Sequence, residues 1–331
     1  MAEPLLKVEN LVKYFPVYQR GILTKKKVGD VHAIDQISFA IGKGETVGLV
    51  GESGCGKTTT GKVILDLEEK DSGNVLFEGK DIHDSLKSSS REEKLALRRS
   101  MQMVFQNPYG SLDPRMTVFD IISEPFLIHK HIPRSEWRDR VYSLLQLVGL
   151  EEYHAERYPH EFSGGQRQRI SIARALATEP KFIVADEPVS SLDVSIRAQI
   201  LNLLEDLQKK TGISFLYISH DLSSVRQVSQ SVAVMYLGKI FEYAPVSQVF
   251  DTPLNPYTMA LLSAVPIPDP EKHTKRIILP GDVPSPVNPP PGCRFHPRCP
   301  YAAEVCRTDE PPLRQLGTSH LVACHFAEKF A

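Results

Sequence analysis

Short apolar segments separated by glycine, proline and charged residues mark the N-terminal third of the chain. Leu5–Val12, Ala33–Ile41, Thr46–Val50 and Val75–Phe77 either alternate apolar and polar residues or form short apolar runs, and both patterns predict strands. Gln19–Asp30 is basic and contains glycine, so we expect a loop there. The chain is therefore expected to begin with several strands.

The pattern becomes helical between about Met116 and Pro180, where apolar residues recur at the spacing of one helix face. Farther on, short apolar strands alternate with helices, and no internal repeat is visible. The predicted helices are Ser88–Ser100, Val118–Ile128, Ser135–Leu147, Gly164–Ala177, Val194–Lys209 and Leu222–Val228, and the predicted strands are Met101–Phe105, Phe182–Ala185, Ile213–Ile218 and Val232–Tyr236.

A glycine-rich segment directly follows the predicted strand Thr46–Val50 and matches the pattern G-x-x-x-x-G-K-[ST] of a phosphate-binding loop. Gly61–Leu67 behind it predicts a helix, and backbone amides at a helix N-terminus bind phosphate. We expect Lys57 to reach the β- and γ-phosphates, and Thr58 to ligate Mg²⁺. The alternative is a glycine turn that binds nothing. The candidate nucleotide-binding residues are Gly51, Glu52, Ser53, Gly54, Cys55, Gly56, Lys57, Thr58 and Thr59.

Two carboxylates end the apolar segment Phe182–Ala185. A strand that ends in a carboxylate beside a phosphate loop is the usual arrangement for holding Mg²⁺. We expect Asp186 to bind the metal, directly or through water, and Glu187 to polarise an attacking water. The alternative is a strand that merely ends in two acids.

A second glycine-rich helix start lies upstream, at Ser163, Gly164, Gly165 and Gln166. Free amides and the positive end of the helix dipole make such a turn a phosphate-binding surface. Its position before Asp186 makes the chain resemble the ATP-binding cassette family, in which this sequence is the signature motif.

The resemblance extends over nearly the whole chain, because further elements of the family follow in order. Gln106 resembles the Q-loop glutamine, for which the family implies a catalytic role and contact with Mg²⁺. Ser190–Asp193 resembles the D-loop, and His220 resembles the switch histidine that contacts γ-phosphate. Phe15 lies where the family places an aromatic ring on adenine, and Tyr14 is the second candidate.

Within the family, four segments are similar to ATPases of oligopeptide and dipeptide importers: Phe105–Pro114, Asp186–Ser195, Asn255–Thr258 and Gly292–Pro300. The chain is most similar to the F-type subunit of such importers. The resemblance implies that it binds and hydrolyses ATP in a head-to-tail heterodimer with a homologous D-type ATPase subunit. Two membrane permeases would carry the peptide, and an extracytoplasmic peptide-binding protein would act indirectly. Nickel or sugar cargo, or a soluble non-transport ATPase, are the alternatives.

The implied fold is α/β, of the P-loop type found in ATP-binding cassettes. It has a mostly parallel core sheet, an antiparallel β portion, a helical insertion at about 107–180 and a small cysteine-rich C-terminal extension. We expect an ATP-binding domain over residues 1–265 and a cysteine-rich extension over 293–331. The linker between them, 266–292, is expected to be stiff because nine of its 27 residues are proline.

Four of the five cysteines lie in the tail, spaced C-x5-C-x6-C-x17-C. Clustered cysteines in a reducing compartment suggest metal more than disulfide, and a tail with little core of its own needs an organising centre. The resemblance implies a 4Fe–4S cluster on Cys293, Cys299, Cys306 and Cys324 with a structural or assembly role. A four-thiolate zinc site and unligated thiols remain the alternatives.

The composition and net charge limit the kinds of partner that the chain is expected to bind. With 41% hydrophobic and 24% charged residues the chain is an ordinary globular protein, and a net charge of −1 gives no electrostatic reason to expect nucleic-acid binding. Residues 1–10 lack the pattern of a secretory signal, and the longest apolar runs are far shorter than the roughly 20 residues of a membrane span. We expect a peripheral protein on the cytoplasmic face of the cell membrane, attached through its partners.

Overall fold

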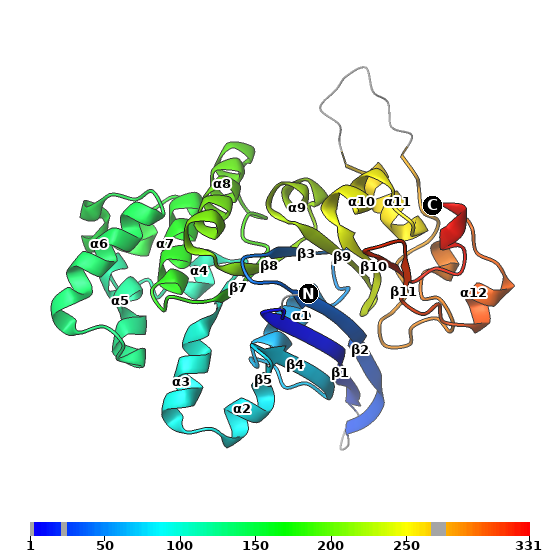
Figure 1. Ribbon diagram of the computed structural model, residues 1–331, viewed down its shortest axis with the longest axis horizontal. Helices are drawn as coiled ribbons and strands as arrows, with labels where there is room; N and C mark the ends of the chain where they lie inside the picture. Colours follow the sequence, from blue (N-terminus) through cyan, green and yellow to red (C-terminus); the bar gives the residue numbers. More distant parts are fainter. Residues whose placement is uncertain (1–2, 21–24, 266–275) are drawn as a thin grey trace.

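The structure, a computed structural model, describes residues 3–20, 25–265 and 276–331. Two β-sheets lie near the centre of the molecule, with a lobe of helices at one end and the C-terminal segment at the other (Figure 1).

The larger sheet has eight strands in the order β11-β12-β10-β9-β3-β8-β7-β6. The five strands from β9 to β6 are parallel to their neighbours, whereas β10, β12 and β11 are added antiparallel. Strands β3, β7 and β8 are buried at every residue, which explains their continuous apolar sequences. The strands are β3 (Thr46–Val50), β6 (Met101–Val104), β7 (Phe182–Asp186), β8 (Ser214–Ser219), β9 (Ser231–Tyr236), β10 (Lys239–Pro245), β11 (Arg314–Leu316) and β12 (His320–Val322).

The smaller sheet is antiparallel, in the order β2-β1-β4-β5. Its apolar face packs against the central strands of the larger sheet in one buried cluster that includes Leu6, Ile34, Leu49 and Leu216. The strands are β1 (Leu6–Arg20), β2 (Lys25–Ile41), β4 (Ser72–Phe77) and β5 (Lys80–Asp81).

Helices α5, α6 and α7 contact one another and form the lobe at the left of Figure 1. The α-helices are α1 (Lys57–Ile64), α2 (Ile82–Ser88), α3 (Arg91–Ser100), α4 (Pro108–Ser111), α5 (Val118–His129), α6 (Trp137–Leu147), α7 (Gly164–Leu176), α8 (Val194–Thr211), α9 (Leu222–Val228), α10 (Val246–Asp251), α11 (Pro256–Ser263) and α12 (Glu304–Thr308). Short 3-10 helices span Arg134–Glu136, Glu152–Glu156, Pro159–Glu161, His296–Arg298 and Ala327–Lys329.

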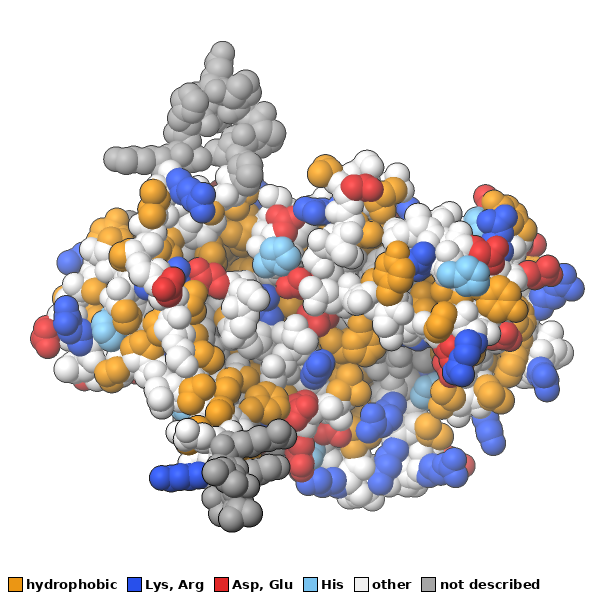
Figure 2. Space-filling view, turned by 180° about the vertical axis from the view of Figure 1, so that it is seen from behind, with side chains coloured by type: hydrophobic (Ala, Val, Ile, Leu, Met, Phe, Trp, Pro, Cys, Tyr) orange, Lys and Arg blue, Asp and Glu red, His pale blue; other side chains and the backbone are white. Residues whose placement is uncertain are grey.

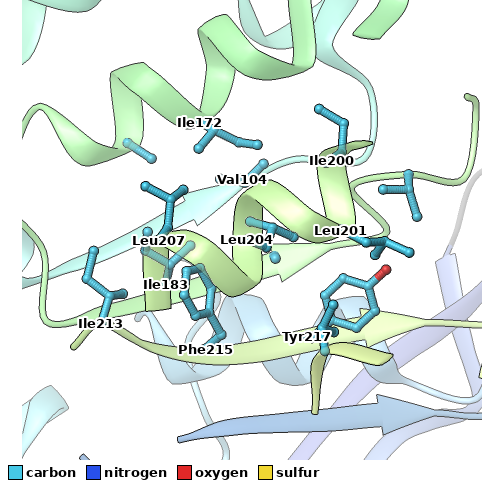
Figure 3. Close-up of a cluster of buried hydrophobic side chains, with 14 of the residues drawn as sticks. Val104, Ile172, Ile183, Ile200, Leu201, Leu204, Leu207, Ile213, Phe215 and Tyr217 are labelled. Atoms are coloured by element: carbon cyan, nitrogen blue, oxygen red, sulfur yellow. The ribbon is translucent and has the colours of Figure 1, made fainter. Parts of the chain in front are cut away.

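Helix α8 shows how the helices are attached to the sheet. Its buried residues, Ile200, Leu201, Leu204 and Leu207, follow the helical repeat and face the side chains of β7 and β8 (Figure 3). The helix begins at Asp193, whose carboxylate accepts a hydrogen bond from the N–H of Ile196 at 3.1 Å. The sequence between β7 and β8 therefore folds back over the sheet.

The predicted α/β architecture with an antiparallel portion is confirmed, but several local predictions were wrong. Gln19–Asp30 is not a loop, because β1 and β2 continue as a hairpin in which Tyr18 pairs with Lys27, and residues 21–24 lie outside the described part. The helix predicted at Ser88–Ser100 begins only at Arg91, since Ser90 caps α3 in a capping box with Glu93, and Ser88 is the last residue of α2. The helix predicted at Gly61–Leu67 runs from Lys57 to Ile64.

The C-terminal segment is joined to the larger sheet. Strand β12 pairs with β10, and the buried Glu242 on β10 accepts hydrogen bonds from the N–H groups of Leu254 and Asn255 and contacts His320 Nε2 at 2.6 Å. Phe295 and Val322 are 2% and 0% exposed. The tail therefore has only a small buried cluster of its own, as expected, and it is held mainly by packing against the rest of the protein. The proposed boundaries at residues 265 and 292 stay a prediction.

Acidic and basic side chains are interspersed on the face shown in Figure 2, in keeping with the net charge of −1. Within residues 3–20, 25–265 and 276–331, no helix has the length and apolar character needed to cross a membrane.

Candidate functional site

A cavity of about 510 Å³ lies where β3, β7 and β8 end beside the N-terminus of α1. It collects residues from six separate parts of the sequence, as expected for a ligand site at the carboxyl ends of parallel strands. Its lining residues are Phe15, Val31, Ala33, Ser53, Gly54, Gly56, Lys57, Thr58, Thr59, Gln106, Glu187 and His220.

The glycine-rich loop, residues 51–58, connects β3 to α1. Gly56 has φ +109°, and a Cβ at this position would lie 1.9 Å from the carbonyl oxygen of Ala33, so only glycine fits. Gly51 is similarly enclosed, since its Cβ would lie 2.1 Å from the carbonyl oxygen of Met235. The Lys57 ammonium donates to the carbonyl oxygens of Gly51 and Glu52 at 2.8 and 2.9 Å. The loop therefore closes around its own lysine.

Thr58 and Asp186 meet at the end of β7, where the Thr58 hydroxyl donates to Asp186 Oδ1 at 3.0 Å. Asp186 is 3% exposed, and burial raises the pKa of this carboxyl, with a further rise from the neighbouring Glu187. Hydroxyl and carboxylate oxygens are ligands that Mg²⁺ prefers. The pair therefore fits a Mg²⁺ site, and a cation there would favour the ionised form of Asp186.

Glu187 forms the centre of a second group of polar contacts. Its carboxylate accepts a hydrogen bond from Gln106 Nε2 at 2.9 Å and lies 3.2 Å from His220 Nδ1. Its backbone φ is +45°, a left-handed conformation that is uncommon for a non-glycine residue, and its N–H is bonded to the carbonyl of Ile218. Strained backbone of this kind concentrates at functional sites. The three predicted catalytic residues thus lie together, and their roles stay a prediction.

The two aromatic candidates for adenine differ in position. Phe15 lines the cavity, and the Lys13 ammonium lies 5.1 Å from its ring centroid. Tyr14 instead stacks on His32 with ring centroids 4.1 Å apart, and burial raises its pKa to about 12. This geometry favours Phe15 over Tyr14.

Among the described residues, the signature residues Ser163 to Gln166 do not line the cavity. They form a capping box at the start of α7, in which Ser163 Oγ accepts from the N–H of Gln166 and Gln166 Oε1 accepts from the N–H of Ser163. A Cβ on Gly165 would lie 2.2 Å from Ile196, so close packing against α8 also requires glycine here.

The four tail cysteines lie in one region, and none of them forms a disulfide in the described structure. The N–H of Cys293 donates to the carbonyl of Cys306 at 2.9 Å. Burial raises the pKa of Cys293 to about 12 and that of Cys299 to about 11, and neighbouring thiols, including Cys324, add to both. Among the described residues, however, no three His, Cys, Asp or Glu side chains are arranged to hold a metal ion. As it stands, the arrangement does not fit a bound metal.

Sequence reasoning missed two residues that contact the glycine-rich loop from far along the chain. Arg298 pairs with the Glu52 carboxylate, and the hydroxyl of Tyr257 accepts a hydrogen bond from the N–H of Glu52 at 3.0 Å. Both belong to segments that resemble the peptide importers, Asn255–Thr258 and Gly292–Pro300. The segments were recognised, but nothing in the sequence connects them with residue 52.

The fold and the site define a P-loop nucleotide hydrolase: a phosphate-binding loop lies beside a strand that leads into two acidic residues, on one parallel sheet. Two family models match the chain: "ABC transporter" over residues 34–190, and "Oligopeptide/dipeptide transporter, C-terminal region" over residues 241–306. The second match includes three of the four tail cysteines, Cys293, Cys299 and Cys306.

Similar proteins agree with these matches. The oligopeptide transport ATP-binding protein AppF of Bacillus subtilis (strain 168) is 51% identical over 98% of this chain and 97% of its own length. The dipeptide transport ATP-binding protein DppF of Escherichia coli (strain K12) is 46% identical over 98% and 95%. A dimeric structure of the ATP-binding cassette MJ0796, bound to ADP and Pi, is 27% identical with a TM-score of 0.62, covering 73% of this chain and 98% of that one. The chain therefore belongs to the ATP-binding cassette transporter family, among the ATP-binding subunits of oligopeptide and dipeptide type.

Proposed function

We propose that the chain binds and hydrolyses MgATP in a head-to-tail pair with a homologous D-type ATPase subunit and so powers peptide import through two membrane permeases. The observation that carries this proposal is the cavity that gathers Lys57, Thr58, Gln106, Glu187 and His220. The names of the similar transport proteins support peptide as cargo.

We assign a role to each of these residues from its contacts. Lys57 would exchange its bonds to loop carbonyls for bonds to the β- and γ-phosphates, while Thr58, Asp186 and Gln106 would hold Mg²⁺. The metal would supply charge neutralisation on the phosphates. Glu187 orients and polarises the attacking water, and His220, beside it, contacts the γ-phosphate.

The position of the signature residues supports the head-to-tail pair. Gly164 and Gly165 form the N-terminus of α7 and lie outside the cavity lining, so their N–H groups can face a nucleotide held by another cassette, whereas the N–H of Ser163 is bonded to Gln166 Oε1. The dimeric MJ0796 structure, bound to ADP and Pi, is a precedent for a pair of such cassettes. A homologous subunit would in turn present its own signature residues to Lys57.

A groove of about 280 Å³ beside Gln106 supports contact with the permeases. Phe105, Pro125 and Ile128 line it, and Phe105 and Ile128 are 36% and 53% exposed. An apolar groove of this kind accepts the apolar face of a short helix. The segment that follows Gln106 is also joined to the signature helix, because the Arg167 guanidinium lies 3.9 Å from the centroid of the Tyr109 ring. We infer that the permeases dock at this groove on the cytoplasmic face of the membrane, and that the neighbouring segment after Gln106 couples the docking site to the signature helix.

We also propose a 4Fe–4S cluster on Cys293, Cys299, Cys306 and Cys324, with zinc as the alternative. The gathering of all four thiols in one region supports it, whereas their present arrangement does not form a metal site. A cluster would therefore require the thiols to move closer together.

Purification from native membranes tests the transport function. The full chain carrying an affinity tag is expected to copurify with a homologous ATPase and two integral membrane proteins. Vesicles that contain this complex should accumulate peptide only with ATP, and Lys57→Ala should abolish uptake. Uptake of nickel or sugar in place of peptide would redirect the cargo. Copurification without membrane proteins would favour the soluble, non-transport alternative.

A further inference from the structure

The C-terminal tail reaches the glycine-rich loop through one arginine. Arg298 Nη1 and Nη2 donate to the two carboxylate oxygens of Glu52 at 2.8 and 3.1 Å, which is the bidentate geometry of a strong ion pair. Arg298 is only 8% exposed, so water screens this contact weakly. The two residues are 246 positions apart in the sequence, yet Arg298 belongs to the short helix between Cys293 and Cys299.

A group of packed aromatic side chains also contacts Glu52. The Tyr257 hydroxyl accepts a hydrogen bond from the N–H of Glu52 at 3.0 Å. The Tyr257 ring lies 4.7 Å from Tyr236 and 5.3 Å from Phe295, centroid to centroid. The backbone and the side chain of Glu52 are thus both fixed by residues from the C-terminal part of the chain.

The charge of Glu52 gives this contact a consequence for ligand binding. The same residue offers its carbonyl oxygen to the Lys57 ammonium at 2.9 Å, so its carboxylate belongs to the loop that closes around this lysine. A free carboxylate there would repel phosphate and compete with it for Lys57. The paired guanidinium neutralises the carboxylate and turns it toward the tail.

We propose that Arg298 is a positioning residue for nucleotide binding: it neutralises and orients Glu52, so that the tail sets the affinity of the glycine-rich loop for the phosphates of ATP. This inference rests on the proposed assignment of the loop as the ATP phosphate site. The arginine acts through Glu52 and does not touch the nucleotide.

The test compares nucleotide affinity in single and double variants of the full chain. MgADP binding is measured by isothermal titration calorimetry, and steady-state ATP hydrolysis separates KM from kcat. Arg298→Gln should raise the Kd for MgADP and the KM for ATP about tenfold, within the range typical of coupling between sites, while kcat changes less than about twofold. Arg298→Lys, which retains the charge but not the fork, should lose less affinity.

The double variant Glu52→Gln/Arg298→Gln removes the carboxylate that Arg298 neutralises, so its affinity should return to within about threefold of the original chain. Arg314→Gln is the matched control, because Arg314 also pairs with a glutamate, Glu328, but within the tail. It should leave MgADP affinity unchanged.

Unchanged affinity in folded Arg298→Gln would overturn the proposal, and so would a double variant that binds as weakly as Arg298→Gln, because the arginine would then only support the fold. If Arg298→Gln does not fold, the MgADP affinity of Glu52→Gln is compared with that of the double variant. Both variants lack the Glu52 carboxylate, so a weaker affinity in the double variant would overturn the proposal. Lys57→Ala tests the site itself. If MgADP still binds this variant, the proposed ATP site is wrong. If Lys57→Ala loses MgADP affinity and Arg298→Gln does not, only the role of Arg298 is refuted.

Discussion

Replacing Gly56 with alanine tests whether the glycine-rich loop is fixed by its contact with β2. The added Cβ would lie 1.9 Å from the carbonyl oxygen of Ala33, whereas real Cβ atoms essentially never approach within 3.0 Å, so loop and strand must separate by about 1.1 Å. The left-handed backbone, φ +109°, adds strain of about 1–3 kcal/mol. Because a displacement of about 1 Å near the reacting groups costs about 100-fold in rate, kcat/KM for ATP should fall by that factor, or about 2.7 kcal/mol.

The assay is steady-state ATP hydrolysis, with MgADP binding and thermal unfolding measured on the same preparations. Gly212→Ala is the control, since Gly212 also has a positive φ, +71°, but its Cβ would meet no atom within 4 Å. It should lower Tm by a few degrees, as expected for about 1 kcal/mol, and leave the ATPase rate unchanged. Folded Gly56→Ala with kcat/KM within about threefold of the original chain would refute the reasoning.

Three further predictions concern catalysis, docking and the tail. Glu187→Gln should still bind ATP but lower turnover at least 100-fold, about 3 kcal/mol in barrier, and near-normal hydrolysis would remove Glu187 from its proposed role. Cysteines placed in the segment 107–116 should crosslink to a permease loop in the assembled complex, whereas crosslinks found only elsewhere would move the interface. Anaerobically purified protein should be brown with about four irons per chain, and Cys293→Ser should lose them; a colourless preparation with one zinc would replace the cluster by a zinc site.

Part of the cavity could be predicted from local patterns, whereas Phe15, Gln106 and His220 were identified by their resemblance to the family. The glycine-rich loop follows a buried strand, the pair Asp186 and Glu187 ends another, and His220 follows a third. Parallel neighbours in one sheet bring these three strand ends to the same edge. Local patterns together with the family resemblance were therefore enough to predict most of one site from residues far apart in sequence, although neither identified Val31 or Ala33.

The loop predicted at Gln19–Asp30 was wrong because its structure depends on pairing between strands and not on a local pattern. Basic residues and glycine are typical of loops, but the hairpin of β1 and β2 is stabilised by backbone pairing, which composition does not report. Strand β12 was missed as well, because a three-residue strand has no detectable period and is selected by its pairing with β10.

Polar contacts of the tail could not be predicted at all, since each joins positions that share no local pattern. Arg294 is bonded to the buried Asp35 on β2, Arg298 to Glu52, and Lys239 on β10 to Glu310. Of these pairs Arg294 and Asp35 are both buried, and leaving the carboxylate of such a pair without its partner costs about 3–5 kcal/mol.

These contacts change how the tail should be regarded. A tail that served only to hold its cysteines would need no ionic contact with β2 or the glycine-rich loop. Here Arg294 and Arg298 flank Phe295, which is buried in the main core, so one short segment packs an aromatic ring and neutralises two carboxylates of the N-terminal half. Because both arginines lie between or beside Cys293 and Cys299, any rearrangement that brings these thiols together would act on Asp35 and Glu52 as well. If the proposed cluster forms, we therefore expect its assembly to move Arg294 and Arg298 and, through Glu52, to affect the nucleotide loop.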